Sequence, residues 1–253
     1  MEELYNLPFE TDAGIAERAA IGVIVLASDN TLEYEFRQIF DLPGVGLYQS
    51  RIYNDNTITP ETLSAMEGRI TQASDLILPG CNLDVVAYGC TSASIVLGEE
   101  QIFKQIRKSR PDARYTTPIT AALAAFKAFG AENIGVLTPY RTDVNSLVKD
   151  YIEKAGFCVP VFGSFNEEDD PTAARISTAS IKAAALEVGA HRDVDAVFVS
   201  CTSLRLASIA GEIETELNKP VTSSNHAMAW HCLRLAGVED RLPKFGRLYS
   251  LGL

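Results

Sequence analysis

The sequence contains an internal repeat, and this repeat limits the folds that the chain can adopt. Residues 83–95 and 193–205 each contain a short apolar run that ends in Cys-Thr-Ser, with the cysteines at Cys90 and Cys201. A stretch with the pattern of a helix follows each run. The two cysteines therefore occupy matching places in two similar halves of the chain.

A second pair of matching segments supports this duplication. The apolar run that begins at Ile21 is similar to the one that begins at Ile134, and a polar turn and a helix-like stretch follow both. Cys90 lies 69 positions after Ile21, and Cys201 lies 67 positions after Ile134. Two separate signals at nearly equal spacing indicate two related lobes.

Short β-rich runs alternate with longer amphipathic stretches along the chain. This order predicts an α/β fold in which each lobe is a parallel sheet flanked by helices. The predicted strands are Ile21–Ala27, Gly46–Tyr53, Val85–Gly89, Ala113–Tyr115, Ile134–Thr138, Cys158–Phe165, Ala196–Ser200 and Pro220–Thr222. The predicted helices are Leu32–Phe40, Pro60–Leu76, Ser92–Arg110, Ile119–Phe129, Tyr140–Ala155, Pro171–Val188, Ser203–Leu217 and Ala227–Ala236.

The repeat also predicts how the chain divides into lobes. We expect a first lobe of residues 1–117 together with 226–253, and a second lobe of residues 118–225, related by a pseudo-two-fold axis. Ligands of open α/β sheets bind at the carboxyl ends of the strands, where both cysteines fall. A cleft between lobes is also a common place for a small ligand. We therefore expect the active site in the cleft between the lobes.

Composition argues against several classes of protein. The formal net charge is −11, which disfavours a nucleic-acid-binding protein because phosphates need a basic face. No apolar run reaches the roughly 18–20 residues of a membrane helix. Residues 1–20 contain five acidic side chains and lack the basic start and apolar centre of a secretory signal. We therefore expect a cytoplasmic protein with no nucleic-acid or membrane partner.

The five cysteines show no spacing that is typical of a metal site. Neither Cys-x-x-Cys nor His-Glu-x-x-His occurs, so we expect no bound metal. Cys81, Cys158 and Cys232 are interpreted as small buried hydrophobic side chains. Cys90 and Cys201 are the two whose surroundings indicate chemistry.

Cys90 is expected at the start of a helix, directly after a buried strand. Backbone N–H groups and the helix dipole stabilise an anion at that place, which lowers the pKa of a thiol. Thr91 and Ser92 add hydroxyl donors beside the sulfur.

Thr202 and Ser203 follow Cys201 in the second half, so the same environment is expected there. If the two halves face each other, two thiols reach one pocket from opposite sides. Such a pair suits a reaction that removes a proton or attacks a carbon on one face of a substrate and acts on the other face.

Three further polar residues are candidates for binding a substrate carboxylate. Asn30 lies in the turn after the first strand, Tyr140 lies in the equivalent turn of the second half, and Asn166 follows a later strand. Asn30 has an alternative interpretation as a helix N-cap, with Glu33 completing a capping box, and Tyr140 has one as surface packing. The acidic run 167–170 is interpreted as a solvated loop.

These motifs resemble those of the aspartate/glutamate racemase superfamily. Cys-Thr-Ser ends a strand in each half, and Ser-Asp-Asn-Thr-Leu-Glu, from Ser28, follows the first strand. Together with Tyr-Gly-Cys-Thr-Ser-Ala-Ser, from Tyr88, they look most like the branch that holds maleate cis-trans isomerases and arylmalonate decarboxylases. The chain is also similar to the ectoine-utilisation A proteins. The resemblance covers residues 20–251.

The resemblance implies a reaction without a cofactor, on a small mono- or dicarboxylate. Cys90 and Cys201 match the two catalytic cysteines of the isomerase pattern, and Asn30, Tyr140 and Asn166 match its substrate-binding residues. Arylmalonate decarboxylases keep only the second-half cysteine, with glycine at the first place, so a decarboxylase is disfavoured. A homo-oligomer is compatible with the resemblance.

We expect a cis-trans isomerase that converts maleate to fumarate. The polar stretch 220–226 departs from the isomerase pattern and keeps open a racemase of an amino acid or an N-acetyl-diamino acid. A non-catalytic small-molecule-binding protein is the alternative from another class, because two lobes around a cleft also suit a sensor. In the isomerase interpretation, the carboxylates are held by Asn30, Tyr140 and the residues after each cysteine, namely Thr91, Ser92, Thr202 and Ser203.

Overall fold

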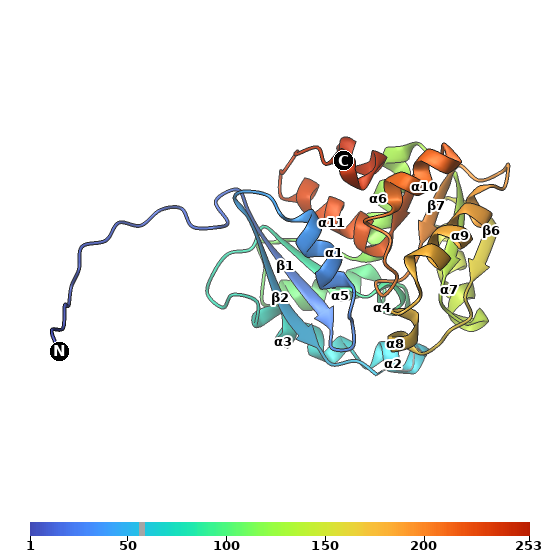
Figure 1. Ribbon diagram of the computed structural model, residues 1–253. Coiled ribbons are helices and arrows are strands. Elements are labelled where there is room, and N and C mark those ends of the chain that lie inside the picture. The colour runs from blue at the N-terminus through green and yellow to red at the C-terminus, as the bar shows by residue number, and fades with distance from the viewer. Residues whose placement is uncertain (56–58) are drawn as a thin grey trace.

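The structure, a computed structural model, describes residues 1–55 and 59–253. Two four-stranded parallel sheets form its centre (Figure 1). The first has the strand order β2-β1-β3-β4 and the second the order β6-β5-β7-β8. The strands are β1 (Ala19–Leu26), β2 (Val45–Ile52), β3 (Val85–Gly89), β4 (Arg114–Thr116), β5 (Asn133–Thr138), β6 (Cys158–Ser164), β7 (Ala196–Val199) and β8 (Val221–Ser223).

Helices flank both sheets, which confirms the predicted α/β class. The α-helices are α1 (Leu32–Ile39), α2 (Pro60–Ser64), α3 (Ile70–Asp75), α4 (Thr91–Leu97), α5 (Glu99–Arg107), α6 (Pro118–Phe129), α7 (Thr142–Lys154), α8 (Asp170–Ala173), α9 (Thr178–Gly189), α10 (Ala210–Leu217) and α11 (Ser224–Leu235). Short 3-10 helices lie at Glu67–Arg69, Pro243–Phe245 and Arg247–Ser250. Within the described residues, no helix is both long and apolar enough to cross a membrane.

The strand order places β3 and β7 at equivalent positions, each beside the strand that opens its sheet. All residues of β3 and β7 are buried. Parallel strands covered on both faces have continuous apolar sequences, which explains the runs before the two cysteines. The duplication seen in the sequence is therefore present in the topology, and it brings Cys90 and Cys201 to matching ends of two sheets.

Helices α6 and α11 pack against each other and join the two halves (Figure 1). Helix α11 contacts strands of both sheets, and its residues 224–234 are all buried. Trp230 of α11 belongs to the same apolar cluster as Ala121 and Ala125 of α6. The chain after β8 thus returns to the first sheet. The proposed lobe boundaries after residues 117 and 225 stay a prediction.

Three predicted helices are divided into shorter ones. The stretch Pro60–Leu76 forms α2, a 3-10 turn and α3, and the stretch Pro171–Val188 is covered by α8 and α9. The helix expected over Ser92–Arg110 is interrupted at Gly98, which has φ 82° and ψ 141°. Helical periodicity continues through this junction, so the apolar pattern did not reveal it.

The segment after Cys201 forms turns rather than the predicted helix over Ser203–Leu217. Helix α10 begins only at Ala210. Leu204 and Leu206 are fully buried in the turns, and this burial gives the segment the apolar spacing of a helix. The two cysteines therefore differ in local backbone structure although they match in topology.

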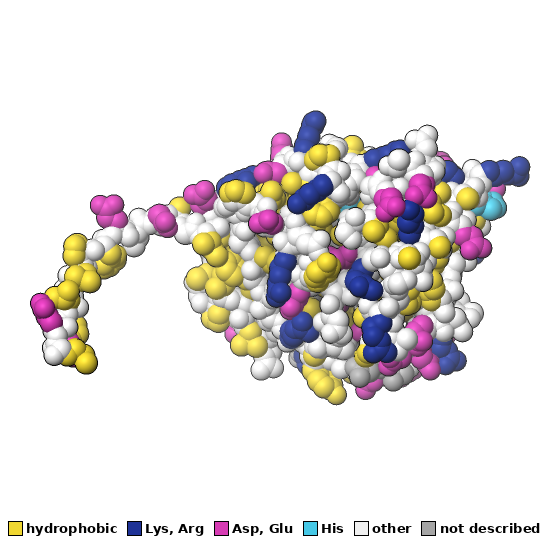
Figure 2. All heavy atoms as spheres, in the orientation of Figure 1, with side chains coloured by type: hydrophobic (Ala, Val, Ile, Leu, Met, Phe, Trp, Pro, Cys, Tyr) yellow, Lys and Arg dark blue, Asp and Glu magenta, His cyan; other side chains and the backbone are white. Residues whose placement is uncertain are grey.

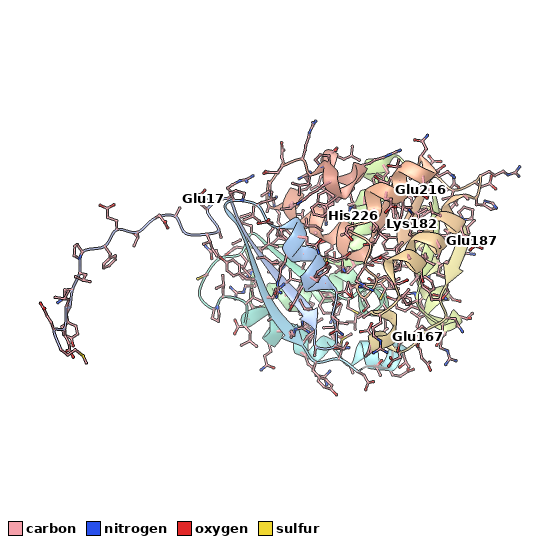
Figure 3. The ribbon with its side chains drawn as sticks, viewed as in Figure 1. Glu17, Glu167, Lys182, Glu187, Glu216 and His226 are labelled. Atoms are coloured by element: carbon pink, nitrogen blue, oxygen red, sulfur yellow. The ribbon has the colours of Figure 1, made fainter. Side chains whose placement is uncertain are left out.

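Residues 1–15 form an extended arm that leaves the body beside β1 (Figure 1). Glu17 lies where the arm joins the body (Figure 3). Large apolar side chains and acidic side chains are exposed along the arm (Figure 2). The apolar ones are Met1, Leu4, Tyr5, Leu7, Phe9 and Ile15. Both sheets begin after this segment.

Gly98→Ala is expected to lower the free energy of unfolding by about 1–3 kcal/mol, because alanine rarely adopts this positive φ. Among the described residues, no atom lies within 4 Å of the added Cβ, so the loss reports backbone strain. Gly68→Ala is the matched control, since its Cβ also meets open space and its φ is not positive. Urea unfolding followed by circular dichroism measures both variants, and equal losses would contradict the prediction.

Candidate functional site

A pocket lies at the carboxyl ends of β3 and β7. Cys90, directly after β3, and Cys201, two residues after β7, both line it. The other lining residues come from both halves of the chain and are Leu26, Asn54, Asp55, Thr62, Leu63, Met66, Thr91, Ser92, Tyr140, Asp170 and Thr202. The fold thus brings two thiols from equivalent strand ends to one small pocket.

Cys90 is the N-cap residue of α4. Its sulfur accepts a hydrogen bond from the backbone N–H of Ala93 at 3.5 Å and lies 3.7 Å from Oγ of Ser92. Burial raises the pKa of this thiol to about 11, and the charge of Asp170 adds to the rise. The expectation of a lowered pKa is therefore wrong, because desolvation outweighs the N–H groups of a short helix.

Cys201 lies at the start of a turn. The backbone N–H of Ser203 donates to its sulfur at 3.3 Å, and the Tyr140 hydroxyl also interacts with it. Burial raises the pKa of the Cys201 thiol to about 12, and the charge of Asp170 is the next largest cause. Both cysteines are thus thiols at neutral pH in the free pocket.

Four of the predicted substrate-binding residues line the pocket with the cysteines, namely Thr91, Ser92, Tyr140 and Thr202. Tyr140 is 3% exposed, which excludes surface packing as its role. Ser203 is buried outside the lining, and its hydroxyl donates to Oδ1 of Asp170 at 2.6 Å. Hydroxyl groups therefore surround the two sulfurs.

The structure places Asn30 and Asn166 away from this pocket, contrary to expectation. The Asn30 side chain is exposed and donates to the backbone carbonyl of Ser28 at 2.9 Å. It is not the helix N-cap either, since Thr31 holds that position. Asn166 is exposed, has φ 54°, and lines a separate surface hollow with Arg141. In both turns the local backbone directs the amide toward solvent.

In the turn between β1 and α1, Asp29 is the buried residue and Asn30 is the exposed one. Its Oδ1 accepts the backbone N–H groups of Thr31 at 2.7 Å and Leu32 at 2.8 Å, and so it caps the start of α1. Burial raises the pKa of Asp29 to about 6, against the effect of these hydrogen bonds. Aspartate and asparagine cap helices equally well, so their order in this turn did not show which side chain is buried.

Asp170 lines the pocket, contrary to its interpretation from the sequence. It belongs to the acidic run interpreted as a solvated loop, yet it is 6% exposed and lines the pocket. Its neighbour Asp169 is exposed and caps α8. Pro171, at the second position of α8, is a local sign of an ordered helical turn in this run.

A buried carboxylate holds the turn that follows Cys201. Glu35 of α1 is 2% exposed and accepts the backbone N–H of Ala207 at 2.7 Å and the side-chain amide of Asn225 at 2.8 Å. The same amide donates to the backbone carbonyl of Thr202 at 2.7 Å. Glu35 therefore fastens the Cys201 turn of the second half to a helix of the first half.

Residues 221–226 of the polar stretch are buried, and among the described residues none of the stretch lines the pocket. Oγ1 of Thr222 lies 2.9 Å from Nδ1 of His226, whose Nε2 lies 2.6 Å from the carbonyl oxygen of Phe245. His226 lies in the interior, on α11 (Figure 3). The hydroxyl of Ser224 lies 2.7 Å from that of Thr91. These internal hydrogen bonds account for the polarity without a different substrate.

Comparison with known proteins assigns the family. The model of the arylmalonate decarboxylase family matches residues 48–249. The chain belongs to this family. The maleate isomerase of Nocardia farcinica is 27% identical over 241 residues, which cover 90% of this chain and 94% of that protein. The arylmalonate decarboxylase of Bordetella bronchiseptica is 29% identical over 137 residues, which cover 53% of this chain and 57% of that protein.

Solved structures share the fold of this family member. One is a cysteine-to-serine variant of the Nocardia farcinica maleate cis-trans isomerase with a covalently bound succinylcysteine intermediate. It has a TM-score of 0.83 at 24% identity and covers 92% of this chain and 98% of its own. A liganded arylmalonate decarboxylase variant has a TM-score of 0.80 at 24% identity, with 91% of this chain and 98% of that chain covered.

The two pocket cysteines should react more slowly than the two exposed ones. Cys81 and Cys158 are exposed, so their interpretation as buried is wrong, whereas Cys232 is buried. Because burial raises the pKa of Cys90 and Cys201, we expect iodoacetamide to modify them about 10²-fold more slowly than the exposed pair at pH 8. Mass spectrometry of timed samples measures each site, and equal rates would contradict the raised pKa values of Cys90 and Cys201.

The contribution of Glu35 to stability should fall as pH rises from about 5 to 7. The buried His226 and His231 act in the opposite direction, because burial lowers their pKa from 6.5 to about 4. Burial raises the pKa of Glu35 from 4.5 to about 7, so the folded protein binds this proton more tightly than the unfolded chain does. The protonated side chain thus favours folding. The contribution is complete below pH 4.5 and is lost as pH rises through 7. Asp29, with a pKa raised to about 6, acts in the same direction.

Glu35→Gln should remove a loss of roughly 2–3 kcal/mol between pH 5 and pH 8 and leave the parts due to Asp29, His226 and His231. Glu100→Gln, on the exposed side of α5, is the control and should leave the dependence unchanged. Denaturant unfolding at pH 5 and pH 8 gives the free energies. If Glu35→Gln keeps the full wild-type slope, the assignment to this carboxyl is wrong.

Proposed function

We propose that the protein is a cofactor-independent cis-trans isomerase that acts on a small unsaturated dicarboxylate such as maleate. The observation that carries this proposal is the pair of thiols, Cys90 and Cys201, at the lining of one pocket. A decarboxylase is disfavoured because the chain has cysteine at both places. A non-catalytic binding protein would have no need for two sulfurs at equivalent strand ends.

In the proposed reaction, the Cys90 thiol passes its proton to a carboxylate of the bound substrate, which returns it when the product leaves, and Cys90 adds as thiolate to one carbon of the double bond. A C–S bond forms, the π electrons move toward the far carbon and its carboxylate, and the Cys201 thiol gives its proton to that carbon. The central bond is then single and rotates. The Cys201 thiolate takes the proton back, the C–S bond breaks, and the trans product leaves with both sulfurs restored. The succinylcysteine in the Nocardia farcinica isomerase is an adduct of this kind.

Hydrogen-bond donors around the sulfurs suit the negative charge that develops on the substrate carboxylates. Thr91, Ser92, Tyr140 and Thr202 supply hydroxyl groups at the pocket lining. Fixed donors of this kind stabilise an enediolate-like charge without reorganisation, which is commonly the largest catalytic effect.

The second candidate function is a racemase of an amino acid or an N-acetyl-diamino acid. The buried carboxylate of Asp170 favours it, because a carboxylate can receive an ammonium group. One cysteine would remove the α-proton and the other would return a proton to the opposite face. Proton NMR distinguishes the candidates: fumarate from maleate supports the isomerase, whereas deuterium at Cα with loss of chirality, for single enantiomers of aspartate in D2O, supports the racemase.

Cys90→Ala and Cys201→Ala should each lower turnover by about 10²–10⁴-fold, since each removes one of two groups that act in sequence. Cys81→Ala, an exposed cysteine outside the pocket, is the matched control and should retain wild-type turnover. The rate of fumarate formation from maleate measures all three. Full activity in either pocket variant would reject the two-thiol mechanism.

A further inference from the structure

The pocket contains a buried carboxylate that the proposed reaction does not use. Asp170 is 6% exposed and lines the pocket together with Cys90 and Cys201. Its Oδ1 accepts the Ser203 hydroxyl at 2.6 Å, and its Oδ2 accepts the Ser28 hydroxyl at 3.0 Å. A carboxylate accepts about four hydrogen bonds, so each oxygen can accept one more donor.

No cation balances this carboxylate in the described part of the chain. None of the described lining residues is lysine, arginine or histidine, and Asp170 forms no ion pair with a described residue. Arg141, which directly follows the lining residue Tyr140, pairs with the exposed Glu168. The titratable groups near Asp170 cannot carry a positive charge. They are carboxyl, thiol and phenol groups, namely Asp29, Asp55, Cys90, Cys201 and Tyr140.

The negative charge therefore acts on anything that enters the pocket. It already raises the pKa of both thiols. A fully ionised dicarboxylate would add two more negative charges beside it, whereas a substrate that carries a proton donor would complete the hydrogen bonds of Asp170. Two carboxylates that lie close together in a buried site repel each other. Proteins relieve this repulsion when the pair shares one proton.

We propose that Asp170 selects substrates that present a proton-bearing group beside a carboxylate, and that it excludes the full dianion. This inference rests on the proposed function for the place where the substrate binds. Two kinds of substrate carry a proton-bearing group beside a carboxylate. One is the carboxylic acid group of a half-ionised dicarboxylate such as hydrogen maleate, and the other is the ammonium group of an amino acid.

Binding measured without turnover tests the inference. Maleate and aspartate are titrated by calorimetry into the full-length Cys90→Ser variant, in which addition cannot begin, at pH 6, 7 and 8. Two buffers with different ionisation enthalpies give the number of protons taken up. The same titrations are made with Asp170→Asn added, and with Asp169→Asn added as the matched control, because Asp169 is an exposed aspartate one residue away.

If a half-ionised dicarboxylate is the ligand, maleate affinity falls about tenfold per pH unit above the second pKa of maleate, with uptake of about one proton at pH 8. If an ammonium group is the ligand, aspartate binds with little proton uptake and with an affinity that stays level from pH 6 to pH 8. Asp170→Asn should abolish the proton uptake in the first case and weaken aspartate at least about tenfold in the second. Asp169→Asn should change neither.

The inference is overturned if the maleate dianion binds without proton uptake, if Asp170→Asn behaves like Asp169→Asn, or if neither compound binds. Failure of the proposed function gives a different result. In that case proton-linked binding depends on Asp170, yet wild-type protein forms no fumarate from maleate at any of the three pH values.

Discussion

The meeting of the two thiols depends on one buried carboxylate. Cys90 is held by regular structure on both sides, but Cys201 leads into turns that have no helix or strand of their own before α10. Glu35 supplies the acceptor for a backbone N–H of those turns, and through Asn225 it also fixes the carbonyl of Thr202. A side chain from the first half therefore holds the turn that follows the sulfur of the second half.

Burial has opposite effects on binding and on reactivity in this pocket. It removes water from the hydroxyl groups of Thr91, Ser92 and Thr202, which strengthens their hydrogen bonds to an anion. It also raises the pKa of both thiols, so the reactive thiolate is scarce before the substrate arrives. The chemistry thus depends on how the bound substrate redistributes protons and charge among the sulfurs and Asp170.

The sequence predicted the sheets and both pocket cysteines, because buried parallel strands and a repeated tripeptide leave strong, position-specific patterns. It did not predict which side chain of a polar turn is buried: Asp29 and Asn30 are chemically similar, and only the backbone of the turn separates them. The burial of Asp170 was not predicted for the same reason, since Asp170 differs from the exposed Asp169 only in the direction of its side chain. The turns after Cys201 look helical in sequence because their leucines are buried by tertiary contacts.

The two halves match in topology but not in the detail around the sulfurs. Cys90 caps a helix, whereas Cys201 opens a turn and contacts the hydroxyl of Tyr140. A symmetric molecule such as maleate therefore loses its symmetry on entering the pocket, since its two ends meet different neighbours. Its olefinic carbons become chemically distinct, and a single order of attack and protonation follows from the scaffold rather than from the substrate.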